Sequence, residues 1–348
     1  MKRFSFNVFY GQLVRGKEVR MKWSYRVWLL QAGLALTVLF ATLPAQAQDY
    51  PTRDIHAICN FPAGTGGDVF VRFFSEKLSA LAGKTVIVDN RGGAFGNIGT
   101  EAAARSKPDG YTILIVPGSS TMAAAVSGFK KLPFDPIKDF TPVTTLAKLG
   151  FVLVVDPKTP IKSMADLTAH LKTKGDKASY GTSSNTGLIA AELYKKFASL
   201  PQVIKVQYRE NQTALNDMYA GNLDFLSVDA PWAIEQAKAG RLRALAVTSA
   251  DRLSVLPDVP TVEEAGVKGY GDVTPWWAVF VPATTPQPIV DKLEAWFNQI
   301  AASTETKKWL NNLGSDPFPG NARMLEQLLS KDIKRWGEYY KLANIEPQ

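Results

Sequence analysis

The stretch NFPAGTGGDVFVRFF, from Asn60 to Phe74, joins a strand pattern to a helix pattern through a turn rich in glycine. The apolar run Ile55–Phe61 predicts a buried strand, and three of the four residues at Gly64–Gly67 are glycine. A strand that leads through a short loop into a helix is the repeating unit of α/β folds, and ligands of such folds bind where strands end. The stretch therefore predicts an α/β fold with a ligand site at this turn.

A second unit of the same kind lies further along the chain. The segment ASYGTSSNTG, from Ala178 to Gly187, also leads into a helix pattern. In both helix patterns one face stays apolar, because the apolar residues are spaced by four, four and three positions. They are Phe70, Phe74, Leu78 and Leu81 in the first helix, and Ile189, Leu193, Phe197 and Leu200 in the second.

Short apolar segments separated by helix patterns favour α/β layers with largely parallel sheets. Eight such segments predict strands: Ile55–Phe61, Thr85–Asp89, Tyr111–Val116, Phe151–Val155, Val203–Tyr208, Leu223–Asp229, Leu242–Thr248 and Trp276–Val281. The C-terminal segment Pro286–Pro347 predicts two or three helices, with breaks at Gly314 and Gly320.

The length of 348 residues, 46% of them hydrophobic, favours two lobes over one. We expect the chain to cross between the lobes near residues 148 and 274. Residues 48–148 and 275–348 then form lobe 1, and residues 149–274 form lobe 2.

The first 47 residues predict an export segment. A basic region that begins at Met21 precedes the apolar run Val27–Leu43, and PAQAQ follows with small residues at Ala45 and Ala47. This is the pattern of a secretory signal peptide, residues 21–47, which is cleaved after Ala47. The alternative is a membrane anchor, for which the apolar run is short.

Most of the net charge belongs to that segment. The chain carries a net charge of +8, and residues 1–47, with seven Lys or Arg and one Glu, account for six of these charges. The remainder is close to neutral, which argues against nucleic acid or a membrane surface as a partner. Cys59 is the only cysteine, so there is no disulfide framework and no cysteine metal site. It lies in a strand pattern and is predicted to be a buried, small apolar residue.

Both glycine- and serine-containing loops have the chemistry of an anion site. A helix N-terminus has unpaired N–H groups and about half a positive charge, and glycine lets the backbone approach a ligand. Such a site needs no cationic side chain. Thr65 adds a hydroxyl to the first loop, and Thr182–Thr186 gives the second loop a run of small polar residues. Each loop has a structural alternative, a tight connection or a helix cap. Asp68 is predicted to brace the first loop.

Nucleotide binding and hydrolysis are poorly supported. The sequence GTGGDV has no lysine after the glycines and lacks the spacing of a dinucleotide fingerprint. There is no G-x-S-x-G nucleophile elbow. The two histidines, His56 and His170, have no partner that the sequence identifies. We therefore expect no enzyme, no cofactor and no metal site.

Six segments carry a resemblance to a known family. In chain order they are FPAGTGGDV, NRGGAFGNIGTEAAARSKPDGYTIL, ASYGTSSNTG, ALNDMYAGNLDF, GRLRALAVTSADRLSVLPDVPTVEEAG and WWAVFVPATTPQPIVDKL. Together they resemble the substrate-binding proteins of tripartite tricarboxylate transporters, the Bug or TctC-like family, over Tyr50–Ile345. The resemblance implies a periplasmic-binding-protein fold of the venus-flytrap type. Two α/β lobes with mixed, largely parallel sheets then enclose a ligand cleft.

The resemblance also implies where a ligand binds. A carboxylate is expected on the loops that match Phe61–Asp68 and Thr182–Gly187, together with ordered water. The loop Pro117–Thr121 is expected to face the cleft, and Asp229 matches an acidic family position, with a helix cap as the alternative. The candidate ligand-binding residues are Phe61, Ala63, Gly64, Thr65, Gly66, Gly67, Asp68, Ser119, Ser120, Thr182, Ser183, Ser184, Asn185, Thr186, Gly187, Asn211, Asp229 and Trp232.

Departures from the family pattern bear on the ligand. After Tyr208 the family often has glycines, whereas this chain has RENQ. Glu210 would repel a polyanion in the cleft, and Asn211 and Gln212 would bond a neutral or singly charged end. This favours a monocarboxylate or dicarboxylate over a citrate-like acid.

Three tryptophans bear on whether that acid is aromatic. An indole beside the cleft would stack on an aromatic acid. For Trp232 this interpretation and core packing stay open, whereas Trp276 and Trp277 are predicted to pack in the core.

The function implied is a periplasmic binding protein, acting as a monomer, that delivers a small carboxylate to a membrane permease with TctA- and TctB-like subunits. A sensory module that presents the same ligand to a membrane sensor kinase is the alternative, and an exported enzyme is a remote one.

Overall fold

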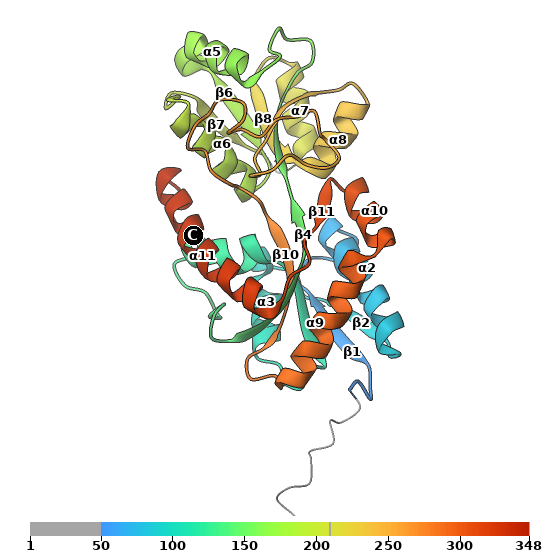
Figure 1. Cartoon of the computed structure of the whole chain (residues 1–348). Coiled ribbons are helices and arrows are strands. Elements are labelled where there is room, and N and C mark those ends of the chain that lie inside the picture. Colours follow the sequence, from blue (N-terminus) through green and yellow to red (C-terminus); the bar gives the residue numbers. More distant parts are fainter. Residues whose placement is uncertain (1–49, 209, 348) are drawn as a thin grey trace, which may run out of the picture. The chain divides into compact units, whose positions relative to one another are not determined.

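Two β-sheets, one above the other in Figure 1, organise the chain. The computed structural model describes residues 50–208 and 210–347, so the predicted export segment lies outside the described residues. The six-stranded sheet has the order β11-β4-β10-β3-β1-β2. Its strands are β1 Ile55–Cys59, β2 Val86–Asn90, β3 Thr112–Pro117, β4 Phe140–Leu149, β10 Trp276–Pro282 and β11 Ser315–Pro317.

The second sheet has five strands in the order β7-β6-β8-β5-β9. They are β5 Phe151–Val155, β6 Ser179–Thr182, β7 Ile204–Gln207, β8 Phe225–Asp229 and β9 Arg243–Val247. Each of the eight predicted strand segments overlaps an observed strand. The strands β4, β6 and β11 were not predicted. β4 contains Pro142 and three threonines, β6 is only four residues long and leads directly into a polar loop, and β11 is only three residues long.

The sheets are mixed, but the expectation that they are largely parallel is wrong. Among the described strand pairings four are parallel and five are antiparallel. β10 is antiparallel to both β3 and β4, and β5 is antiparallel to both β8 and β9. β5 is the first strand after the chain enters the five-stranded sheet, and β10 is the first strand after it returns to the six-stranded sheet. Both strands run opposite to the strands beside them.

The outward crossing passes through a glycine that packs against Leu253. Gly150 alone separates β4 from β5, and a Cβ atom there would lie 2.6 Å from Leu253 Cδ1. Real Cβ atoms do not approach so closely. A larger residue would therefore require the buried side chain of Leu253 to shift.

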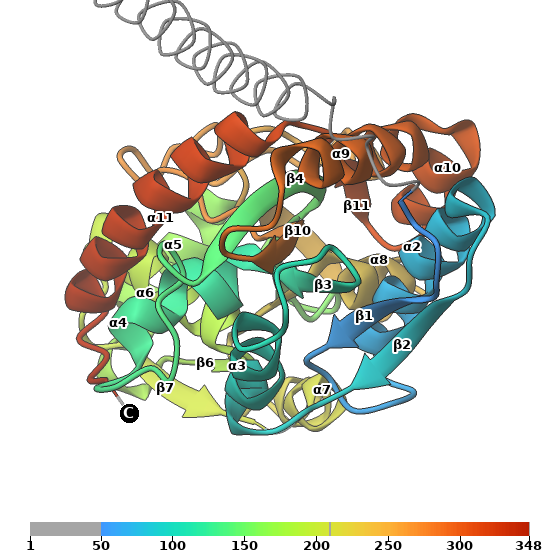
Figure 2. The same cartoon turned by 90° about the horizontal axis from the view of Figure 1, so that it is seen from below.

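Helices cover both sheets (Figures 1 and 2). Those associated with the six-stranded sheet are α2 Gly66–Ala82, α3 Asn97–Ala104, α4 Ala125–Gly128, α9 Gln287–Ala302, α10 Thr304–Asn312 and α11 Ala322–Leu342. The others are α5 Met164–Lys174, α6 Asn185–Phe197, α7 Asn211–Tyr219 and α8 Ala230–Lys238. The structure also has three short helical segments of other types, η1 Ala94–Gly96, η2 Ser119–Ala124 and η3 Gly175–Lys177.

The long helix α11 contacts both halves of the structure. It packs against β4, η2 and α4 on one side and against α6 on the other, and Figure 2 shows it along one edge of the molecule. The predicted C-terminal helices are confirmed as α9, α10 and α11, with Gly314 and Gly320 in the breaks.

The buried residues confirm most of the core predictions. Cys59 is fully buried, and burial raises the pKa of its thiol. Trp276 and Trp277 are both buried, and Trp277 stacks between Phe61 and Phe70. Phe197, which the pattern places on the apolar face of its helix, is 37% exposed at the last position of α6. None of the helices in the described residues is long and apolar enough to cross a membrane.

Candidate functional site

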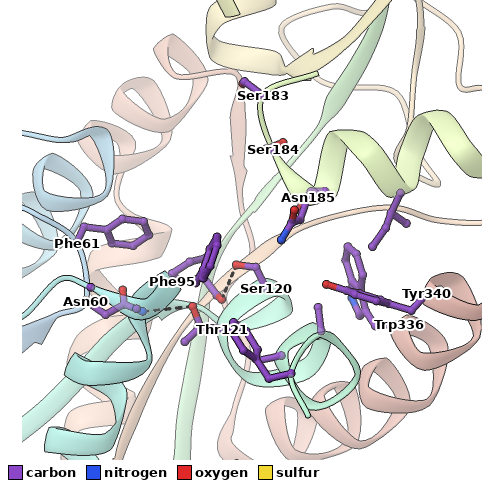
Figure 3. Close-up of a pocket in the computed structure, with 18 of the residues that line it drawn as sticks. Asn60, Phe61, Phe95, Ser120, Thr121, Ser183, Ser184, Asn185, Trp336 and Tyr340 are labelled. Carbon is purple, nitrogen blue, oxygen red and sulfur yellow. Dashed lines mark hydrogen bonds between the residues drawn. The ribbon is translucent and has the colours of Figure 1, made fainter. Parts of the chain in front are cut away.

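A cavity of about 460 Å³ lies where loops of the two sheets meet (Figure 3). Its size falls in the range of small-molecule sites. The lining residues from the side of the six-stranded sheet, and from α11, are Asn60, Phe61, Pro62, Gly93, Phe95, Gly96, Pro117, Ser120, Thr121, Ala124, Ala125, Phe129, Trp336 and Tyr340. Those from the side of the five-stranded sheet are Ser183, Ser184, Asn185, Thr186, Ile189 and Gln207.

The N-terminus of α6 faces this cavity. Ser184 is the N-cap, and its hydroxyl oxygen accepts a hydrogen bond of 3.1 Å from the N–H of Gly187. The cap leaves the N–H groups of Asn185 and Thr186, which also line the cavity, outside the helical ladder. These groups, with the helix dipole behind them, can bind an anion without a cationic side chain.

Close backbone packing places α6 at that point. A Cβ atom on Gly187 would lie 2.3 Å from the hydroxyl oxygen of Thr182 and 2.7 Å from the carbonyl oxygen of Ser227. Thr182 donates its hydroxyl to the same carbonyl at 2.9 Å. Glycine at this position therefore brings the helix end onto β6 and β8. Thr182 and Gly187, both predicted site residues, lie behind the cavity and not on its lining.

Polar contacts behind the second loop orient Ser183. Its hydroxyl donates to Asn211 Oδ1 at 2.6 Å, and Asn211 Nδ2 donates to Asp229 Oδ2 at 2.9 Å. Asp229 is the N-cap of α8, where its Oδ1 accepts from the N–H of Trp232 at 3.1 Å. The helix-cap interpretation of Asp229 is thus confirmed. Asn211, Asp229 and Trp232 lie outside the lining, and Asn211 contacts it through Ser183.

The first loop encloses its own carboxylate. Asp68 is 3% exposed, and its Oδ2 accepts from the N–H of Gly64 and from Arg72 Nε, both at 2.9 Å. Its Oδ1 accepts from Asn90 Nδ2 at 2.7 Å. The hydrogen bond from Arg72, followed by that from Asn90, lowers the pKa of Asp68 to about 2. The prediction that Asp68 braces this loop is confirmed.

The rest of the first loop lies beside the cavity. Thr65 is the N-cap of α2, and its hydroxyl accepts from the N–H of Asp68 and donates to the carbonyl of Pro62. Of the predicted residues in this loop, only Phe61 lines the cavity. Ala63, Gly64, Thr65, Gly66, Gly67 and Asp68 do not.

The loop after β3 contributes Ser120 and Thr121. Ser120 donates its hydroxyl to the carbonyl of Pro117, and Thr121 Oγ1 accepts from Asn60 Nδ2 at 3.3 Å. Ser119, predicted beside Ser120, is fully buried and accepts from the N–H of Trp276 at 3.2 Å. It therefore joins this turn to β10 and does not reach the cavity.

Two polar atoms of lining residues lack partners. Within the described part of the chain, Asn60 Oδ1 and Trp336 Nε1 are buried and make no hydrogen bond. An unpaired buried donor or acceptor costs about 1–3 kcal/mol, so a ligand group or a water that paired with either would be favoured. No lining residue in the described ranges carries a formal charge.

The sequence prediction and the observed lining share Phe61, Ser120, Ser183, Ser184, Asn185 and Thr186. The aromatic residues Phe95, Phe129, Trp336 and Tyr340 were missed, as were Asn60 and Gln207. Trp336 and Tyr340 belong to the apolar face of α11, which in sequence is indistinguishable from a core pattern. The histidines pair elsewhere, His56 with Asp89 at 3.0 Å and His170 with Asp224 at 2.8 Å.

Two sheets of mixed α/β topology with a neutral, loop-lined cavity define a solute-binding protein of the periplasmic-binding fold. The family model described as "Tripartite tricarboxylate transporter family receptor" matches residues 70–345. The chain therefore belongs to the tripartite tricarboxylate transporter receptor family, TctC, as its sequence segments predicted. Membership makes it a substrate-binding receptor.

Three similar proteins represent this relationship. Protein BugT of Bordetella pertussis is 29% identical over 306 residues, which cover 87% of this chain and 93% of BugT. The structure of R. palustris Rpa4515 with adipate is 31% identical, with a TM-score of 0.74, and the match covers 86% of this chain and 100% of that one. MatC (Rpa3494) from Rhodopseudomonas palustris with bound malate is 27% identical, with a TM-score of 0.68 and coverage of 83% and 99%.

Proposed function

We propose that this protein is an exported, periplasmic binding protein that captures a small organic carboxylate and delivers it to a tripartite tricarboxylate-type permease. The acid is a monocarboxylate or a dicarboxylate, and aromatic acids are included. The protein acts as a monomer with lobe 1 at residues 48–148 and 275–348 and lobe 2 at residues 149–274. It makes and breaks no bond.

The observation that best supports carboxylate capture is that the N-terminus of α6 lies at the cavity. Asn185 and Thr186, in the first turn of α6, line a cavity to which the opposite side contributes most of the other residues. A carboxylate there would accept hydrogen bonds from their N–H groups and from the hydroxyls of Ser184 and Thr121. Each bond to a charged acceptor contributes about 1.5–3 kcal/mol. The adipate and malate of two related structures are small carboxylates of the same chemical class.

Capture would be coupled to closure of the two lobes. Residues of both sides line the cavity, so a ligand that contacts both favours the arrangement in which they approach. Closure also excludes water, which strengthens the contacts between amides and carboxylate. A transport receptor must release its ligand, so a dissociation constant of about micromolar order is expected, or about −8 kcal/mol.

The test is a thermal-shift panel on the protein from Gln48 onward. The acids are C4 to C6 dicarboxylates, citrate, benzoate and phthalate, each beside its amide. A ligand at 100 times its dissociation constant stabilises the folded state by about 2.7 kcal/mol. A shift with an acid and none with its amide supports carboxylate capture. Equal shifts with both, or none with any acid, would contradict it.

A further inference from the structure

An exposed phenylalanine in a strained backbone lies at the cavity. Phe95 is 69% exposed and lines the cavity from η1, where its φ angle is +56°. Ala94, with a φ angle of +46°, precedes it. Bulky residues rarely adopt this left-handed conformation, and such strain is concentrated at functional sites. The chain therefore keeps an exposed ring at a position where solvent exposure and backbone geometry both disfavour it.

The geometry of the neighbouring glycines positions this ring. Gly93 and Gly96, on either side, also have positive φ angles, of 112° and 91°. A Cβ atom on Gly96 would lie 2.4 Å from Asn60 Nδ2. The turn can thus lie directly against Asn60, which brings Phe95 to the cavity.

Other aromatic residues line the same cavity, although Trp336 and Tyr340 are almost fully buried, at 1% and 8% exposure. Phe129 meets Phe95 edge-on, with ring centroids 5.8 Å apart. Figure 3 shows Phe95 on one side of the cavity and Trp336 with Tyr340 on the other. Trp336 and Tyr340 are one turn apart on α11, and Ile189 of α6 adds an aliphatic group. The hydrogen-bonding groups of Ser184, Asn185 and Thr186 come from a different element, the start of α6.

We propose that this cavity selects carboxylates with a flat aromatic body, which stacks on the exposed ring of Phe95, opposite Tyr340 of α11. This specificity rests on the proposed function, because the carboxylate is bound at the start of α6. Aromatic pairs stack offset or edge-to-face, so a planar ring gains contacts on both sides that a flexible chain does not. A rigid ring also loses less conformational entropy on binding than a flexible acid.

The first experiment compares three acids in titration calorimetry on the protein from Gln48 onward. Benzoate has a flat ring, cyclohexanecarboxylate has a puckered ring of similar size, and adipate is an open chain. Benzoate is expected to bind about tenfold more tightly than the other two. Equal affinity for benzoate and cyclohexanecarboxylate would overturn the role of flat stacking, and a preference for adipate would overturn the proposal. Absence of binding by any acid would instead overturn the proposed function, and this inference with it.

The second experiment removes the ring of Phe95 with a residue that tolerates the left-handed backbone conformation. Asparagine tolerates left-handed backbone, so Phe95→Asn deletes the ring and relieves strain. Benzoate affinity is expected to fall about tenfold, whereas adipate affinity changes by less than about twofold. The melting temperature without ligand is expected to stay the same or rise. The matched control is Phe197→Asn, which removes an exposed ring of α6 outside the cavity and should leave both affinities unchanged.

The two readouts separate specificity from structure. If Phe95→Asn lowers the affinity for benzoate and for adipate equally, the ring contributes to binding of any acid and the proposal is wrong. If it lowers the melting temperature without ligand and leaves the ratio of the two affinities unchanged, the ring is structural and the proposal is wrong.

Discussion

Gly66 and Gly67 are neighbours in the first turn of α2, but their surroundings differ. A Cβ atom on Gly67 would lie 2.4 Å from the ring of Phe61, whereas a Cβ atom on Gly66 meets nothing within 4 Å. Phe61 lines the cavity and stacks on Trp277. We expect Gly67→Ala to displace the Phe61 ring and weaken carboxylate binding about tenfold, because overpacking costs about 1–3 kcal/mol.

The control is Gly66→Ala, which makes the same change one residue earlier and should preserve affinity. Titration with the best acid of the panel measures both variants, and circular dichroism checks that both fold. Unchanged affinity in Gly67→Ala would show that neither the first loop nor Phe61 contributes to the ligand site.

The buried carboxylate of Asp68 predicts a pH-dependent stability. Its hydrogen bonds to Arg72, Asn90 and Gly64 stabilise the charged form, so Asp68→Asn should lower the free energy of unfolding by about 2 kcal/mol at pH 7. The folded-state pKa, about 2, lies below the unfolded value of about 3.9. This contribution is therefore fully present above about pH 4 and is lost as the pH falls through 2.

Urea unfolding of the wild type and of Asp68→Asn between pH 7 and pH 2.5 measures this contribution. The difference between the two proteins should be constant down to about pH 4 and then narrow. A difference that stays constant to pH 2.5 would mean that the charge of Asp68 is not what stabilises the loop.

At the scale of elements, two helices with equivalent caps make a matched pair. Ser184 caps α6 at the cavity, and Ser163 caps α5 by accepting from the N–H of Asp166 at a site outside the lining. Ser184→Ala and Ser163→Ala should each lower the free energy of unfolding by about 1 kcal/mol. Only Ser184→Ala should weaken carboxylate binding, by about fivefold, since it also removes a hydroxyl donor.

Urea unfolding and calorimetric titration of both variants distinguish the two roles of a cap. Equal loss of affinity in both would indicate that binding follows overall stability. No loss in Ser184→Ala would place the carboxylate away from the start of α6.

Several of the strands that sequence patterns predicted, such as β3 and β10, are nearly continuous apolar runs. β4 was missed although it lies second from the edge of its sheet, because Pro142 and three threonines interrupt its apolar pattern. The sheet accommodates Pro142 at an irregular register opposite Phe280. That accommodation depends on a partner strand more than a hundred residues away in sequence, so a local pattern does not contain it.

The site was predictable to the extent that its chemistry is local. Ser183–Thr186 forms a contiguous polar loop before a helix, and it was found. Trp336 and Tyr340 reach the cavity only because α11 packs across η2 and α6, a long-range contact. The glycine-rich loop before α2 was predicted to bind a ligand carboxylate, whereas the carboxylate that Gly64 bonds in the structure is that of Asp68.

At the scale of the whole molecule, the cavity draws on both sheets, and this predicts how a ligand changes backbone protection. A bound acid should slow hydrogen exchange at the start of α6 and, at the same time, in η1 and η2 on the opposite side. The reason is that local opening of either wall would break contacts with the ligand. The helix α9, which does not line the cavity, is the internal control and should exchange at an unchanged rate.

Hydrogen-exchange mass spectrometry with and without the best acid, at a concentration about 100 times its dissociation constant, measures this directly. Protection that appears in segments of both walls with the same dependence on ligand concentration is the expected result, because one bound molecule contacts both. Protection confined to the start of α6 would mean that the acid binds one lobe and that closure is not coupled to capture. Protection that extended equally to α9 would instead indicate a general gain in stability, in which the cavity has no special part.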